Sequence, residues 1–329
     1  MSTFLDRFAT GRRRLIGLSL LRIGLGATTA LIYLANFPYR DALYGPNGTT
    51  SFASFSASQH SSGSVFSLYR LSDGETWFNL VYLSGLVAAL VWTVLGGRAL
   101  TLVNAIFIWS LDQRNPNVLD GGDNLARILL LLLVFATTNA YLSPLAARTR
   151  ARLTATSGKP TLLNSVHNAA AVLVVFQICV VYAMSSFWKI VDTRWREGNA
   201  LYYISQLHQF QYSDTATALM HNAAVVTLAC YLTITVQLAV VLLVPSRNRR
   251  LREIALLLVI GMHLGIGATM GLVSFAFYMI AADCALLSDD DYRATRDWLR
   301  RRSASVYRRN APVSPAVPAP EPDLVGGAR

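Results

Sequence analysis

Long apolar runs are the feature of this sequence that most limits what it can fold into. They exceed what the core of a small soluble domain needs and approach the roughly 20 residues with which a helix crosses a bilayer. Only 14% of the 329 residues are charged, against about 25% in soluble domains. These features exclude a soluble enzyme and predict an all-α, polytopic membrane helix bundle. The runs lie near residues 14–37, 77–95, 126–146, 164–188, 218–244 and 254–287.

The placement of positive charge predicts the topology. A net charge of +11 could suggest a nucleic-acid partner, but Lys and Arg also accumulate in the cytoplasmic loops of membrane proteins. With eight crossings, 21 of the 29 basic residues lie inside, 7 lie outside and Arg22 lies within a span. We therefore expect a multi-pass protein of the cell membrane with both termini in the cytoplasm and no nucleic-acid partner. The eight predicted spans are residues 14–37, 77–95, 98–111, 125–146, 165–188, 218–244, 251–270 and 273–287.

The end of the predicted membrane domain is the least certain boundary. Residues 254–287 contain no polar turn and could form one long span. A single span would place the basic residues that follow it outside, against the charge rule, so we expect two spans joined near Gly271. The membrane domain then covers residues 1–287, and residues 288–329 form a basic cytoplasmic tail. The tail beyond residue 310 is rich in Pro and Ala and is expected to be disordered.

Three segments place polar residues in the predicted outer half of the membrane. The first is DQRNPNVLDGGDNLAR, which starts at Asp112 after a third span that is too short to cross fully. Irregular polar backbone at that depth persists only beside protein or a water-filled cavity. Pro116 and a Gly-Gly pair therefore predict a re-entrant turn, with Asp120 or Asp123 capping the next helix. An ordinary tight loop before a capped helix explains the same spacing equally well.

The second polar segment, SSFWKIVDTRWREGNALYYI, follows the predicted fifth span. Lys189 stands out here because Arg supplies 27 of the 29 basic residues. Unlike Arg, Lys can lose its proton when desolvated and then act as a base. Lys189 is therefore a candidate catalytic residue, with Trp195 as a candidate substrate-binding residue. The alternative is a lysine that snorkels to the interface beside Trp188, with Trp195 in an aromatic belt.

The third polar segment is GMHLGIGATMGLVSF. His263 lies about 12 residues into the predicted seventh span and therefore in its outer half. It is either a buried, hydrogen-bonded histidine or a proton-handling group opposite Lys189. The glycines of this segment predict close helix packing. They are Gly261, Gly265, Gly267 and Gly271.

Arg22 lies about 8 residues into the first span, where an unpaired charge is costly. Asp283 lies near the cytoplasmic end of the last span, at a depth that the arginine side chain can reach. We predict that the two residues pair and tie the first span to the last, in a structural role. The alternative is an Arg22 that snorkels alone to the headgroups.

Four motifs in order carry a family resemblance. They are LLRIGLG, SLDQRNPNVLDGGDNLARILL, SSFWKIVDTRWREGNALYYI and HLGIGATMGLVSFAFYMIAA. Over residues 14–287 the sequence resembles the horizontally transferred transmembrane (HTTM) family, which includes the vitamin K-dependent gamma-carboxylases and the bacterial sporulation-delaying protein B group. Without an appended extracytoplasmic domain, the chain is most similar to sporulation-delaying protein B.

The resemblance implies roles for particular residues. In the carboxylases a lysine of the third motif deprotonates reduced vitamin K, and Lys189 stands at its position. His263 matches a carboxylase histidine, and Asn115 matches an asparagine of the second motif. Pro116 stands where the carboxylases have a histidine, which argues against true gamma-carboxylation. The cofactor implied for an enzyme of this type is a reduced quinone such as menaquinone.

Two functions follow from the resemblance. One is maturation or activation of an exported peptide together with a small membrane-anchored partner. The other is quinone-dependent chemistry of the carboxylase type at the extracytoplasmic face. A transporter is less favoured because no paired broken helices are evident. In either case we predict that five residues from the outer half line one cavity, with no metal. They are Asn115, Asp123, Lys189, Trp195 and His263.

Overall fold

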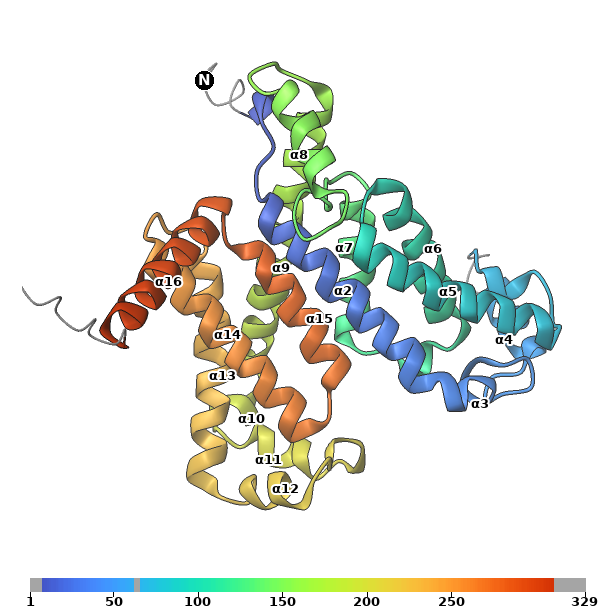
Figure 1. Cartoon of the computed structure of the whole chain (residues 1–329). Helices are drawn as coiled ribbons and strands as arrows, with labels where there is room; N and C mark the ends of the chain where they lie inside the picture. Colours follow the sequence, from blue (N-terminus) through green and yellow to red (C-terminus); the bar gives the residue numbers. More distant parts are fainter. Residues whose placement is uncertain (1–7, 62–65, 311–329) are drawn as a thin grey trace, which may run out of the picture. The chain divides into compact units, whose positions relative to one another are not determined.

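The described part of the chain is helical. The computed structural model describes residues 8–61 and 66–310, and within these ranges it contains helices and turns but no strands (Figure 1). The chain divides into two units, residues 1–291 and 292–329. The predicted all-α fold is confirmed for the described residues.

Within the described residues, five helical segments are long and apolar enough to cross a membrane, which supports a multi-pass membrane protein. The first begins with α2 (Leu15–Asn36) and continues through η1 (Phe37–Tyr39) and α3 (Arg40–Tyr44). The other four are α5 (Glu75–Leu95), α9 (Leu162–Val191), α13 (Ala223–Leu243) and α14 (Arg249–Met270).

Three shorter helices complete the bundle. They are α6 (Arg98–Arg114), α7 (Gly121–Leu133) and α15 (Val273–Asp283). Figure 1 shows α2 running between α5 and α15. These helices approach α2 closely. A Cβ added to Gly24 would collide with Ala281 of α15, and one added to Gly26 would collide with Thr93 of α5. Small residues on α2 therefore let its neighbours pack backbone to backbone.

The predicted span over residues 125–146 is wrong at its C-terminal end. Helix α7 stops at Leu133, and residues 134–145 form turns and bends that bury Ala136 and Ala140. Buried irregular backbone needs donors for its carbonyl groups. Arginines from elsewhere in the chain supply them. Arg98 donates to Phe135 O, Arg150 of α8 (Ala146–Ala155) to Ala140 O, and Arg22 to Leu142 O.

The predicted break in residues 254–287 is confirmed. Helix α14 ends at Met270, Gly271 adopts φ +70°, and α15 begins at Val273. This left-handed conformation favours glycine because a Cβ is strained there. A Cβ on Gly271 would also press against the ring of Tyr212. The sequence therefore contains two helices here, joined at the expected residue.

The connection between α2 and α5 folds onto these helices. It contains α3, α4 (Phe52–Ser61) and η2 (Leu68–Arg70). An aromatic cluster joins it to α2, α5 and α6, and its buried members are Tyr33, Tyr44, Phe55, Tyr69, Phe78, Val81, Tyr82 and Leu111. Burial raises the pKa of Tyr69, whose hydroxyl lies inside this cluster.

Helix α16 (Asp289–Asn310) begins the predicted tail. The Asp289 carboxylate accepts hydrogen bonds from the backbone of Leu15 and Ile16, so it caps the exposed N–H groups at the start of α2. Asp291 forms an ion pair with Arg252 of α14. The disorder predicted beyond residue 310 lies outside the described residues.

Candidate functional site

A cavity of about 690 Å³ lies between α9, α13, α14 and α15. The short helices α10 (Thr193–Arg196), α11 (Ala200–Ser205) and α12 (Asp214–Leu219), which lie near one another in Figure 1, also contribute residues to its lining. Its walls are mostly apolar. Lys189, Trp195 and His263 all line this space, which we call the Lys189 cavity. The structure thus brings together three of the five residues predicted to share a site.

Lys189 projects from the last turn of α9 into the cavity. Its Nζ donates a hydrogen bond of 2.6 Å to Ser185 Oγ, one turn earlier. The same nitrogen lies 5.0 Å from the centre of the Trp195 ring, where a cation–π contact forms. No Asp or Glu of the described residues lies within ion-pair distance of Lys189. Lys189 therefore has one short hydrogen bond, an aromatic neighbour and no counter-ion.

His263 begins a buried hydrogen-bonded chain. Its Nε2 lies 2.9 Å from the Tyr182 hydroxyl, which donates to Asp283 Oδ1 at 2.7 Å. Because the single Tyr182 proton is directed to Asp283, His263 Nε2 must carry the hydrogen of the His–Tyr bond. In the neutral ring, Nδ1 is then an unprotonated acceptor. It is buried and accepts no hydrogen bond within the described part of the chain.

Sequence reasoning missed Tyr182. Residues 182, 185 and 189 are spaced i, i+3, i+7, which places them on one face of α9. All three line the cavity. The helical spacing back from Lys189 was therefore a usable signal, although only the fold brings Tyr182 to His263 and Asp283.

The glycines of α14 do not all have the predicted role. Helix packing is supported for Gly267, where an added Cβ would lie 3.2 Å from Ala276 Cβ. Gly261 and Gly265 have no neighbour within 4 Å of that position and line the Lys189 cavity instead. The prediction of close packing is wrong for these two, because α14 presents them to open space.

Asn115 and Asp123 do not line the Lys189 cavity, so the prediction of one shared cavity is wrong for them. Asn115 is buried, donates to Leu43 O at 2.8 Å and accepts from Asn117 N at 3.2 Å. These contacts hold the connection between α6 and α7 against the α3 region. Asn115 therefore stabilises a loop and lines neither of the two cavities described.

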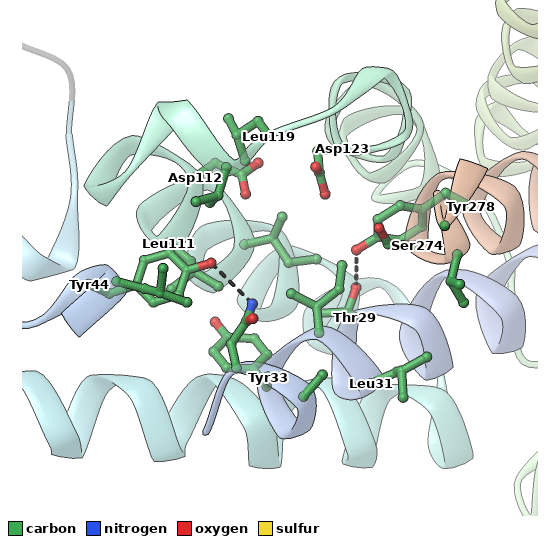
Figure 2. Close-up of a pocket in the computed structure, with 18 residues that line it drawn as sticks. Thr29, Leu31, Tyr33, Tyr44, Leu111, Asp112, Leu119, Asp123, Ser274 and Tyr278 are labelled. Carbon is green, nitrogen blue, oxygen red and sulfur yellow. Dashed lines mark hydrogen bonds between the residues drawn. The ribbon is translucent and has the colours of Figure 1, made fainter. Parts of the chain in front are cut away.

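Asp123 belongs to a second cavity of about 540 Å³ between α2, α6, α7 and α15 (Figure 2). It also completes the predicted cap of α7. The Asp120 carboxylate accepts from Gly122 N and Asp123 N, while Asp123 Oδ2 accepts from Asp120 N at 2.8 Å. The helix begins at Gly121, which is earlier than predicted, because this capping box satisfies its first N–H groups.

The predicted pairing of Arg22 with Asp283 is wrong. Helices α2 and α15 do pack together, but Arg22 donates to Val94 O at 3.0 Å and Leu142 O at 2.6 Å. Both carbonyls lie at or beyond a helix end, where helical hydrogen bonding leaves acceptors free. Asp283 Oδ1 instead accepts a hydrogen bond from Tyr182, while Asp283 Oδ2 is buried and has no hydrogen-bond partner among the described residues. Arg22 and Asp283 therefore each bind other partners, which the sequence did not indicate.

Comparison of the chain with protein-family models, curated proteins and solved structures finds no match. Within the described residues, no three His, Cys, Asp or Glu side chains are grouped so that they could hold a metal ion. The site must therefore be interpreted from its own geometry.

Proposed function

We propose that the chain is a membrane protein in which the Lys189 cavity binds an apolar ligand of the quinone class and Lys189 acts on it as a base. The observation that carries the proposal is an amine without a counter-ion in a mostly apolar cavity of about 690 Å³. That size and polarity suit a ring with an alkyl chain. Cavity walls would hold the rings, while Lys189 and His263 would face the polar oxygens.

The residues of the cavity fit such a group. The buried His263 Nδ1 has a free acceptor position, and the ring lies 5.6 Å from the Phe275 ring, edge to face. A reduced quinone would supply exchangeable hydroxyl protons and two electrons. Lys189 in its neutral form can accept a proton at Nζ, whereas an arginine cannot. Ser185 and Trp195 hold that nitrogen in place.

The topology proposed from charge adds α6, α7 and α15 to the five segments that are long and apolar enough to cross a membrane, which makes eight crossings with both termini in the cytoplasm. The short α7 and α15 are compatible with this topology because other helices pack against them: α6, α9 and α15 against α7, and α2, α7 and α14 against α15. Neither short helix therefore has to span the full bilayer thickness on its own. With this topology, the Lys189 end of α9 faces the extracytoplasmic side.

A second candidate function is peptide maturation of the sporulation-delaying protein B type, within the HTTM family. Pro116 favours this branch because it stands where the carboxylases have a histidine. In the structure it begins the three-residue helix η3 (Pro116–Val118). The cavity chemistry would then serve to modify an exported peptide presented by a small membrane-anchored partner.

Lys189→Arg tests the base. The variant keeps the positive charge but cannot accept a proton. We expect it to abolish maturation of exported peptides, measured by mass spectrometry in a deletion strain carrying each variant. Binding of oxidised menadione, followed by tryptophan fluorescence, should stay within about threefold of wild type. The matched control is Lys159→Arg, at the other lysine of the chain, which is exposed.

Two results would contradict this proposal. Normal peptide maturation by Lys189→Arg would exclude a base at this position. Absence of saturable menadione binding to the wild-type protein would exclude the quinone class of ligand and leave the maturation role to be explained without it.

A further inference from the structure

The second cavity, which we call the Asp112 cavity, has a different chemistry from the Lys189 cavity. It occupies about 540 Å³, and α2 and α15 contribute to it along with α6 and α7. Carboxylates lie on one side and tyrosines on the others (Figure 2). Neither Lys nor Arg is among the residues that line it.

Two carboxylates line this cavity on one side. In Figure 2, Asp112 and Asp123 lie on the same side of the cavity as Leu119, opposite Tyr33. Asp112 is only 5% exposed. Arg127 Nε lies 3.3 Å from Asp112 Oδ2, and it is the only basic side chain of the described residues within ion-pair distance of either carboxylate. One cation thus serves two carboxylates, of which Asp112 is buried and Asp123 half-buried, so ionisation of both would leave a negative charge uncompensated.

A buried hydroxyl without a partner adds an independent observation. Tyr33 lines the cavity with no exposed surface, and its Oη makes no hydrogen bond within the described part of the chain. The other tyrosine hydroxyls at the cavity are satisfied. Tyr44 accepts from Asn36 at 3.3 Å, and Tyr278 bonds Thr29 Oγ1 at 3.0 Å. Leaving a buried hydroxyl unpaired costs free energy that a polar ligand would recover.

From these features we propose that the Asp112 cavity binds an organic ammonium ion with an alkyl chain. An ammonium group provides the missing positive charge and donates to Asp112, Asp123 and Tyr33 Oη together. The aromatic rings of the cavity also suit a cation. Leu31 and other apolar residues of α2 line its remaining wall and would contact the alkyl chain. A metal ion is disfavoured because no third acidic, His or Cys ligand of the described residues joins the pair.

The charge requirement can be tested on the wild-type protein without any substitution. Hexylammonium and hexanol have the same alkyl chain and differ in charge. Isothermal titration calorimetry of the purified full chain in neutral detergent should give saturable binding of hexylammonium at least tenfold tighter than that of hexanol. Equal affinity for the two probes would overturn the proposal, because it would show that the cavity does not select a cation.

Three variants assign the binding to this cavity. Asp112→Asn and Asp123→Asn should each weaken hexylammonium binding at least tenfold, and Tyr33→Phe should weaken it severalfold. The matched control is Asp73→Asn, an exposed aspartate outside the cavity, which should stay within twofold. Thermal unfolding identifies any variant that fails to fold. If an aspartate variant fails, hexylammonium binding by Tyr33→Phe still tests the site, because this substitution breaks no hydrogen bond within the described residues. Unchanged affinity in every folded cavity variant would refute the site.

The source of the ammonium group is a separate arm of the experiment. Nanodiscs of phosphatidylcholine alone are compared with nanodiscs that contain phosphatidylethanolamine, whose headgroup carries a primary ammonium. If the lipid is the source, phosphatidylethanolamine should compete with hexylammonium and weaken its apparent affinity at least tenfold. Unchanged affinity in both nanodiscs supports a free amine as the source. This proposal does not depend on the Lys189 cavity, so either can fail alone.

Discussion

Tyr182→Phe is the most informative single perturbation of the buried hydrogen-bonded chain. It removes one hydroxyl and leaves two buried groups without a partner, Asp283 Oδ1 and His263 Nε2–H. A buried polar group left unpaired costs about 1–3 kcal/mol, and more when it is charged. With two such groups, we expect the free energy of unfolding to fall by about 2–5 kcal/mol.

Two other buried tyrosines provide matched controls for the loss of a hydroxyl. Tyr82 donates one hydrogen bond of 2.7 Å to Tyr33 O, a neutral acceptor, so Tyr82→Phe should cost about 1 kcal/mol. The Tyr33 hydroxyl has no hydrogen-bond partner among the described residues, so Tyr33→Phe should cost close to nothing. Denaturant unfolding in detergent, followed by circular dichroism, should rank Tyr182→Phe as the most destabilising and Tyr33→Phe as the least. Equal costs for Tyr182→Phe and Tyr33→Phe would refute the reasoning.

Two further predictions concern packing and pH. Gly24→Ala should lower the free energy of unfolding by about 1–3 kcal/mol because the new methyl collides with Ala281 of α15. The control is Gly261→Ala, whose methyl meets no atom within 4 Å and which should not be destabilising in the same unfolding assay. Burial of Asp291 opposes its ionisation, but hydrogen bonds from Arg252 and from Ser288 outweigh it and lower the pKa of Asp291. Its ionised form therefore stabilises the fold above the unfolded pKa of about 3.9, and this contribution is lost as pH falls through the lowered value. Unfolding midpoints measured between pH 6 and pH 2 should show this loss in wild type and not in Asp291→Asn; identical pH profiles would contradict it.

The sequence predicted helices best where local signals act alone. The break between α14 and α15 follows from one residue, Gly271, whose left-handed conformation ends the helix. The start of α7 follows from the capping residues Asp120 and Asp123. The early end of α7 at Leu133 could not be predicted, because it depends on donors from distant arginines such as Arg22.

The sequence indicated which charged residues are buried, but not which groups they bind. Arg22 and Asp283 were both identified as buried charges that need partners, and both are fully buried. Depth along a helix constrained how far apart they could lie, but not which way each side chain turns. The packing of α2 points Arg22 toward the end of α5, while α15 turns Asp283 toward Tyr182. Rotation about a helix axis is set by all neighbours together, so a sequence pattern for one helix leaves it undetermined.

The division of the predicted site into two cavities has its origin in α15. Successive residues of a helix point about 100° apart. Ser274 and Tyr278, one turn apart, line the Asp112 cavity, whereas Phe275 and Met279 line the Lys189 cavity. One helix of 11 residues thus forms a wall of both spaces, with an aromatic ring on each side. The acidic residues and the Lys189 group were expected to meet because both were assigned to the outer half of the bundle, but equal depth does not imply contact when a helix lies between.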